Sequence, residues 1–149
     1  MTVLDLGNNI KRNTQIMSSR YAATVSTPTA LDLKDSSWGV IHFNVGSKTG
    51  STTVYTYTIE ESSDNASFTT VKKFVDGEKS TTDSTIVIAA DGTGQEQTYM
   101  VAFETARLER YLRVTCVKTG GGSDTIDTSV HIVTMPDYTG DADAPSFSI

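Results

Sequence analysis

Hydrophobic and polar residues alternate along the stretch 52–71, TTVYTYTIEESSDNASFTTV. Tyr55, Tyr57 and Ile59 fall on one side of an extended chain, and the residues between them fall on the other. Small polar residues then interrupt the alternation, and apolar residues return from Phe68 onward. Because β-branched and aromatic residues with this spacing favour strands, we expect a β-hairpin with one buried face.

Several other stretches have the length and pattern of strands. We expect them at 16–25, 36–45, 84–90, 98–103, 110–118 and 125–135, with a short strand or turn at 31–33. The stretch 84–90, STIVIAA, is almost continuously apolar, which predicts a central strand covered on both faces. Residues 104–109 are expected to form one helical turn or a tight connection. The polar segment between Val75 and Ser84 is expected to be a loop.

Eight or so strands with turn-rich connections predict an all-β fold, a two-sheet β-sandwich. Its topology is expected to be jelly-roll-like, with an immunoglobulin-like sandwich as the alternative. We divide the chain into an N-terminal arm (1–15), a sandwich domain (16–136) and a C-terminal arm (137–149), because the alternation fades near both ends. The arms carry widely spaced apolar residues: Leu4, Leu6, Ile10, Tyr138, Phe147 and Ile149.

Composition supports a sandwich with polar outer faces. Threonine accounts for 24 of the 149 residues. Its branched Cβ favours strands while its hydroxyl tolerates water. A chain of this length can bury one core, so a single folded domain is expected.

The charge of the chain limits its partners. The formal net charge is −6, and the pI is near 4.7. Nucleic-acid binding and attachment to an anionic membrane both need basic surfaces, so neither partner is expected. The first residues, MTVLDLGNNIKR, lack the basic-then-apolar order of a signal peptide. We therefore expect synthesis in a cytoplasm.

The residue types most often used for catalysis and metal binding are scarce. The single cysteine, Cys116, is in phase with Leu112 and Val114, which predicts a small buried hydrophobe instead of a catalytic thiol. His42 and His131 lie in separate expected strands. They could meet across a sheet as metal ligands, but a polar strand face is the simpler interpretation. We expect no catalytic residue, metal or cofactor.

The acidic residues offer two further sites for consideration. Glu60 and Glu61, with Asp64, could supply the carboxylate pair of a glycosidase. Adjacent strand residues point to opposite faces, however, so Glu60 is expected to be a solvated sheet residue. In the C-terminal arm a calcium site is the alternative to a solvated acidic segment; the carboxylates concerned are Asp137, Asp141 and Asp143.

Three arginines are prominent in this acidic chain: Arg107, Arg110 and Arg113. They could form a surface that binds carboxylates of a partner protein, because the guanidinium group is a forked donor. Alternatively, they pair with the chain's own Glu104 and Glu109. Both interpretations remain open from the sequence.

Four short stretches, at 60–63, 64–65, 68–71 and 110–114, together resemble small virion proteins of tailed phages, namely capsid cement (decoration) proteins and related head–tail accessory modules. The resemblance implies a non-enzymatic structural protein on the capsid surface. Its partners would be the major capsid protein and further copies of itself, as a dimer or trimer. Discoidin-type carbohydrate-binding jelly rolls have a similar turn and strand, but they usually carry Trp where this chain has Phe68, and they are usually secreted and disulfide-bonded.

A cement protein is therefore the expected function. The residues expected to contact the capsid are Leu4, Leu6, Ile10, Arg107, Arg110, Arg113, Tyr138, Phe147 and Ile149. The alternative is a carbohydrate- or receptor-binding module, which needs an exposed aromatic platform. Trp38, or Tyr55 and Tyr57, could form that platform, although burial of the two tyrosines in the core is the favoured interpretation.

Overall fold

The computed structural model describes residues 11–21, 23–24, 28–75, 78–89 and 96–136. These residues form one short 3-10 helix, η1 (Thr105–Arg107), and eleven strands: β1 (Lys11–Tyr21), β2 (Leu31–Asp32), β3 (Ser36–Lys48), β4 (Val54–Ser62), β5 (Thr69–Thr70), β6 (Lys72–Val75), β7 (Glu78–Asp83), β8 (Thr85–Ile88), β9 (Gln97–Glu104), β10 (Tyr111–Thr119) and β11 (Ile126–Pro136). In the described part of the chain, no helix has the length and apolar character needed to cross a membrane.

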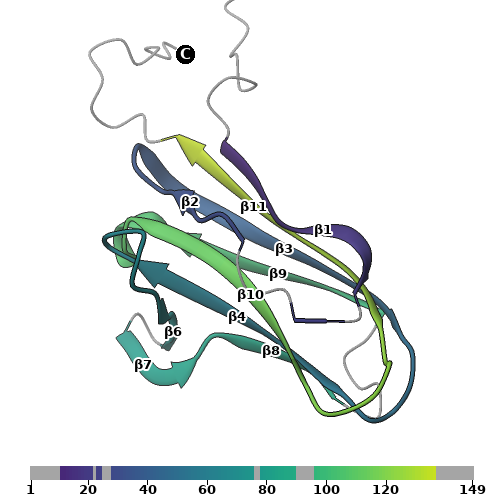
Figure 1. Cartoon of the computed structure of the whole chain (residues 1–149). Helices are drawn as coiled ribbons and strands as arrows, with labels where there is room; N and C mark the ends of the chain where they lie inside the picture. The colour runs from purple at the N-terminus through teal and green to yellow at the C-terminus, as the bar shows by residue number, and fades with distance from the viewer. Residues whose placement is uncertain (1–10, 22, 25–27, 76–77, 90–95, 137–149) are drawn as a thin grey trace, which may run out of the picture.

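The strands form two facing sheets and a small separate hairpin. The first sheet has the order β1-β11-β3-β9, and the second has the order β2-β10-β4-β5, with β8 also paired to β4. Figure 1 shows the two sheets as two layers, with the β6–β7 hairpin to one side. All paired strands are antiparallel. The expected all-β sandwich is confirmed.

The strand pairs identify the topology as a jelly roll. β1 pairs with β11, β2 with β10, β3 with β9, and β4 with β8. The first strand thus lies beside the last, and each later strand pairs with the next one inward, as in a long antiparallel hairpin wrapped into a sandwich. Of the two topologies expected from the sequence, the jelly roll is the one observed.

The core lies between the sheets and is built from alternate residues of the central strands. β4 contributes Tyr55, Tyr57 and Ile59. Both tyrosines are fully buried. Further core residues come from both sheets: Ile41, Phe43, Val45, Ile88, Leu112, Val114, Cys116, Ile126, Val130 and Ile132. The expected inward faces of β3, β4 and β10 are confirmed.

Two expectations about individual elements were wrong. The stretch around β8 is not a central strand covered on both faces: β8 pairs only with β4 among the described strands, and Val87 is 52% exposed. β-branched residues favour strands without requiring burial on both sides. The expected loop before Ser84 contains β7, which pairs with β6. Its sequence, EKSTTD, is polar throughout, so no alternation marked it as a strand.

The strand ends differ slightly from the expected ranges. β1 begins at Lys11, inside the stretch assigned to the N-terminal arm. β3 continues to Lys48, beyond the expected turn at Gly46. The single turn expected at 104–109 is present as η1.

Candidate functional site

An open groove runs along one flank of the sandwich, where the edge of the first sheet faces the edge of the second. β9 is the last strand of its sheet and pairs only with β3 among the described strands, while β8 pairs only with β4. The groove between them has a volume of about 1010 Å³. Its apolar lining comes from both sheets: Ile41, Ile59, Val71, Ile86, Val101 and Phe103.

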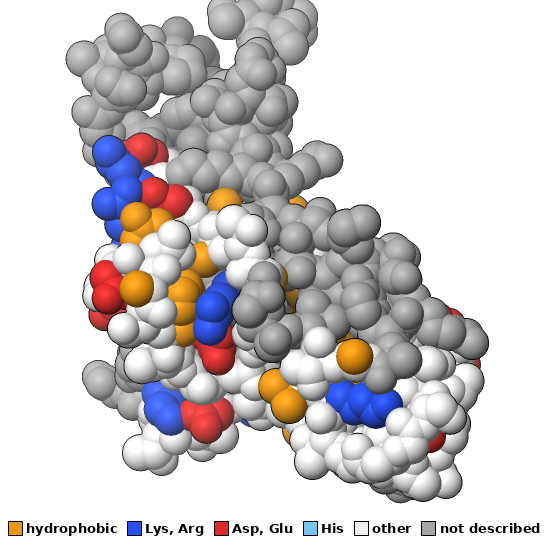
Figure 2. Space-filling model, viewed as in Figure 1, with side chains coloured by type: hydrophobic (Ala, Val, Ile, Leu, Met, Phe, Trp, Pro, Cys, Tyr) orange, Lys and Arg blue, Asp and Glu red, His pale blue; other side chains and the backbone are white. Residues whose placement is uncertain are grey.

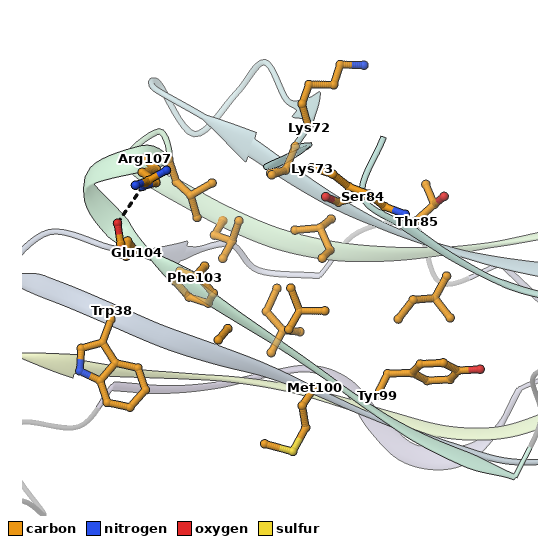
Figure 3. A pocket seen from close by; sticks show the side chains of 18 of the residues that line it. Trp38, Lys72, Lys73, Ser84, Thr85, Tyr99, Met100, Phe103, Glu104 and Arg107 are labelled. Carbon is orange, nitrogen blue, oxygen red and sulfur yellow. Dashed lines mark hydrogen bonds and ion pairs between the residues drawn. The ribbon is translucent and has the colours of Figure 1, made fainter. Parts of the chain in front are cut away.

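The alternation along β9 directs one set of side chains into this groove. Tyr99, Val101 and Phe103 face the core side but are only half-buried, because no strand lies beyond β9 in the described part of the chain. Met100 lies on the opposite face and is 69% exposed. Figure 3 shows Phe103 between the two layers and Met100 pointing away from them.

A glycine allows Phe103 to lie close to the sheet. Gly39 is the cross-strand partner of Phe103. A Cβ at Gly39 would lie 2.6 Å from the Phe103 ring and 2.6 Å from the Val133 carbonyl oxygen. Any side chain at this position would therefore clash with both the Phe103 ring and the backbone of β11.

Among the described residues, the charged side chains that line the groove are Lys72, Lys73, Arg107 and Glu104. Arg107 donates to Glu104 at 2.7 Å, at the end of the groove shown in Figure 3. Lys72 pairs with Asp83 across the β6–β7 hairpin. Figure 2 shows such basic and acidic side chains beside hydrophobic ones on one face of the molecule.

The three arginines expected at a partner surface all form ion pairs within the chain. Arg107 pairs with Glu104, as one of the two interpretations expected. Arg110 makes two hydrogen bonds to Asp32, of 3.1 and 2.8 Å, and Arg113 donates to Glu60 at 2.7 Å. Arg110 and Arg113 thus pair with Asp32 and Glu60, and neither of them pairs with Glu109 as the second interpretation expected.

Three of the residues that carried the resemblance to virion proteins contact one another, and a fourth closes the neighbouring turn. The Arg113 guanidinium lies 3.7 Å from the centroid of the Phe68 ring while it pairs with Glu60. The Asp64 carboxylate accepts hydrogen bonds from the backbone N–H groups of Ala66 and Ser67, which closes the turn after β4. These residues thus have a structural role that the local fold explains.

The acidic residues in β4 and in the turn after it each have a partner within the chain. Glu60 is engaged by Arg113, so it is not the solvated residue that the sequence suggested. Glu61 is 3% exposed and accepts the backbone N–H of Glu109 at 2.9 Å. Hydrogen bonds from the N–H groups of Ser67 and Ala66 lower the pKa of Asp64 to about 2. Each carboxylate is committed to holding a strand or a turn.

Cys116 and the two histidines have the following surroundings. Cys116 is 2% exposed, and burial raises the pKa of its thiol to about 12, so it is a core residue as expected.

His42 and His131 are direct cross-strand partners on the half-buried outer face of the first sheet. In the described ranges, no group of three His, Cys, Asp or Glu side chains is placed to hold a metal ion.

One important carboxylate was not singled out from the sequence. Asp124, in the loop before β11, accepts hydrogen bonds from the backbone N–H groups and hydroxyls of Thr52 and Thr53, over 2.8 to 3.1 Å. Gly50 has a φ of +74°, and a Cβ there would overlap the Asp124 carboxylate. The residue fixes two loops at one end of the sandwich.

The remaining expected contact residues lie outside the described residues. They are Leu4, Leu6, Ile10, Tyr138, Phe147 and Ile149, together with the acidic residues Asp137, Asp141 and Asp143. The two possible aromatic platforms are distinguished: Tyr55 and Tyr57 are buried, whereas Trp38 is 47% exposed and lines the groove.

Comparisons with known proteins include a distant structural similarity. No protein-family model and no curated protein matches the chain. A solved structure described by the words "Bacillus endospore appendages form a novel family of disulfide-linked pili" is similar with a TM-score of 0.42 and 15% sequence identity. The match covers 91% of this chain and 96% of that chain.

Proposed function

We propose that this chain is a non-enzymatic structural protein that joins protein subunits of a larger assembly, and specifically a cement or decoration protein on a virus capsid. The open flank between β9 and β8 is the observation that supports this proposal most. There β9 has a strand edge to which no other described strand is paired, and this edge lies beside half-buried apolar side chains. Such an edge can accept an extended segment of another chain by strand addition.

The rest of the fold is consistent with a mechanical role. Two sheets with a continuous core make a rigid body, and the long register of β4 with β10 links nine residue pairs. The carboxylates of β4 and of the loop before β11 are held by hydrogen bonds or ion pairs, and the thiol is buried. These groups stabilise the fold, which leaves the flank and the outer sheet faces for binding.

The proposal is tested by a substitution inside the groove and a matched one outside it. Val101→Lys places a charge among the apolar residues of the groove, whereas Val117→Lys adds the same charge at an exposed position of β10. We expect particles assembled with the Val101→Lys protein to lose it on washing or heating, and particles with the Val117→Lys protein to retain it. Equal retention of the two folded variants would contradict a binding role for the groove.

A glycan-binding function is the second candidate, because Trp38 is exposed at the end of the groove where Glu104 and Arg107 lie. An aromatic face beside charged hydrogen-bonding groups is suited to a sugar ring. A glycan array, with Trp38→Ala as the control, tests it. Binding that the substitution abolishes would support this candidate over the cement function.

A further inference from the structure

The occupant of the groove can be inferred from its shape, its charge and the sequence that follows β11. We infer that the groove binds residues 137–149 of a second copy of this chain, added as an extra strand beside β9. This inference rests on the proposed function, because it names the partner of the same groove. Copies of this chain would thus bind one another through the same flank that the proposed function uses for assembly.

Charge favours this segment. Residues 137–149, DYTGDADAPSFSI, contain three aspartates and no lysine or arginine. Among the described residues, Lys72, Lys73 and Arg107 line the groove; Lys72 pairs with Asp83 and Arg107 pairs with Glu104, so these five residues together carry a net charge of +1. An acidic segment is attracted to this slightly positive group within an otherwise acidic molecule.

The pattern of the segment also fits an edge strand. In PSFSI, small and apolar residues alternate, so Phe147 and Ile149 fall on the same side of an extended chain. On β9, Tyr99, Val101 and Phe103 present a half-buried apolar row toward the space between the sheets. A strand added to β9 can direct Phe147 and Ile149 into that space, where they bury apolar surface beside this row.

The geometry at the end of the first sheet favours a second copy over the same molecule. Pro136 pairs with Ser36, and Glu104 pairs with Trp38, so β11 and β9 end on the same side of the sheet with β3 between them. To reach its own β9, the segment must turn back over β3 and η1. Thr105 on η1 donates to the Ser36 and Ser37 carbonyl oxygens and closes that end. A neighbouring molecule requires no such reversal.

The experiment measures self-association of the full chain. Sedimentation velocity and light scattering over a wide range of concentrations are expected to show a mass that grows with concentration. The double variant Phe147→Ser/Ile149→Ser and the groove variant Val101→Lys are each expected to weaken association at least about tenfold, since removing one buried apolar side chain has this effect. Val117→Lys is the matched control and is expected to associate like the wild type.

A peptide of sequence 137–149 provides a second measurement that does not depend on the folding of a variant. A labelled peptide is followed by fluorescence anisotropy, because Trp38, the only tryptophan of the chain, shares the outer face of the first sheet with Met100 and does not face the space between the sheets. We expect the labelled peptide to gain anisotropy with the protein, to dissociate the oligomer and to bind more weakly as salt is raised.

Three results would overturn the inference: a wild-type chain that stays monomeric, association that the Phe147→Ser/Ile149→Ser variant leaves unchanged, or a peptide that does not bind. A wild-type monomer in which the molecule's own residues 137–149 fill the groove would also overturn the inference. None of these results affects the particle-retention test, so the inference can fail while the proposed function stands.

Discussion

Two buried tyrosines on β4 differ in the fate of their hydroxyl groups. The Tyr55 hydroxyl donates to the Asp124 carbonyl oxygen at 2.7 Å. The Tyr57 hydroxyl is buried near Thr128 and Cys116 without a hydrogen bond of normal geometry among the described residues. Burial raises the pKa of both tyrosines. An unpaired buried polar group costs stability, and a paired one contributes to it.

The two tyrosine-to-phenylalanine variants should therefore have opposite effects. Tyr57→Phe is expected to leave the free energy of unfolding unchanged or to raise it, while Tyr55→Phe is expected to lower it by about 1 kcal/mol. Urea denaturation with an unchanged m-value measures both. A larger loss for Tyr57→Phe than for Tyr55→Phe would show that the Tyr57 hydroxyl is bonded in solution.

Asp124 predicts a pH dependence of stability. The hydrogen bond from the Thr52 N–H, with the bonds from the Thr53 and Thr52 hydroxyls and the Thr53 N–H, lowers the pKa of Asp124 to about 2. An unfolded aspartate has a pKa of about 3.9, so the unfolded chain binds more protons as the pH falls between these values. The contribution of Asp124 is thus complete above the unfolded pKa and is lost toward pH 2.

Asp124→Asn tests this dependence. The variant is expected to be less stable than the wild type at neutral pH and to lose less stability on acidification, as followed by thermal melts across the acidic range. Asp64, whose pKa is also lowered to about 2, contributes in the same direction in both proteins and does not obscure the comparison. Parallel pH profiles for wild type and variant would contradict the role of Asp124.

The ion pairs of this protein differ in how exposed they are. The side chains of Arg113 and Glu60 are 23% and 20% exposed, and the guanidinium packs on Phe68. The Arg107–Glu104 pair is 42% and 65% exposed. A partly desolvated pair beside an aromatic ring is expected to be stronger than an exposed pair.

Double-mutant cycles measure this difference. We expect a coupling free energy of about 1 kcal/mol for Arg113 with Glu60 and about 0 to 0.5 kcal/mol for Arg107 with Glu104. The exposed pair is the matched control, since both pairs join an arginine to a glutamate. Equal coupling energies would remove the structural explanation for the Arg113 cluster.

The burial of individual residues was predictable from the sequence, but most of their hydrogen-bond and ion-pair partners were not. The phase of Cys116 with Leu112 and Val114 correctly indicated the core. Arg113 meets Glu60 only because β10 and β4 pair in one particular register, across 53 positions of sequence. No local pattern encodes that register, because a shift of two residues leaves the same faces buried.

At the scale of elements, the sequence predicts strands better than it predicts their neighbours. β8 and β9 are both strands as expected, and both lie at a flank in the described chain, which follows from the order in which strands pair. The groove exists because these two edges face one another. Periodicity identifies a strand face and contains no information about which strand is last in a sheet.

The edge position of β9 predicts its dynamics. Its backbone amides are expected to exchange hydrogen roughly tenfold or more faster than those of β3, the strand to which it is paired. Hydrogen–deuterium exchange of the dilute protein measures this difference. Equal protection of β9 and β3 under those conditions would indicate that another segment already covers β9.

At the scale of the whole molecule, a rigid jelly roll carries one open flank. The class of fold was predictable, since strand patterns and turns recur along the chain. The jelly-roll order follows from long-range pairs such as β1 with β11, which no short stretch of sequence specifies. The same fold serves many functions, so the flank carries the functional proposal and the fold does not.

Electron cryomicroscopy of particles that contain this protein tests the central claim most directly. We expect density for an extended segment of another chain, or of another copy, alongside β9 and over Tyr99, Val101 and Phe103. Particles in which this flank faces solvent, with the protein held by other surfaces, would contradict the claim.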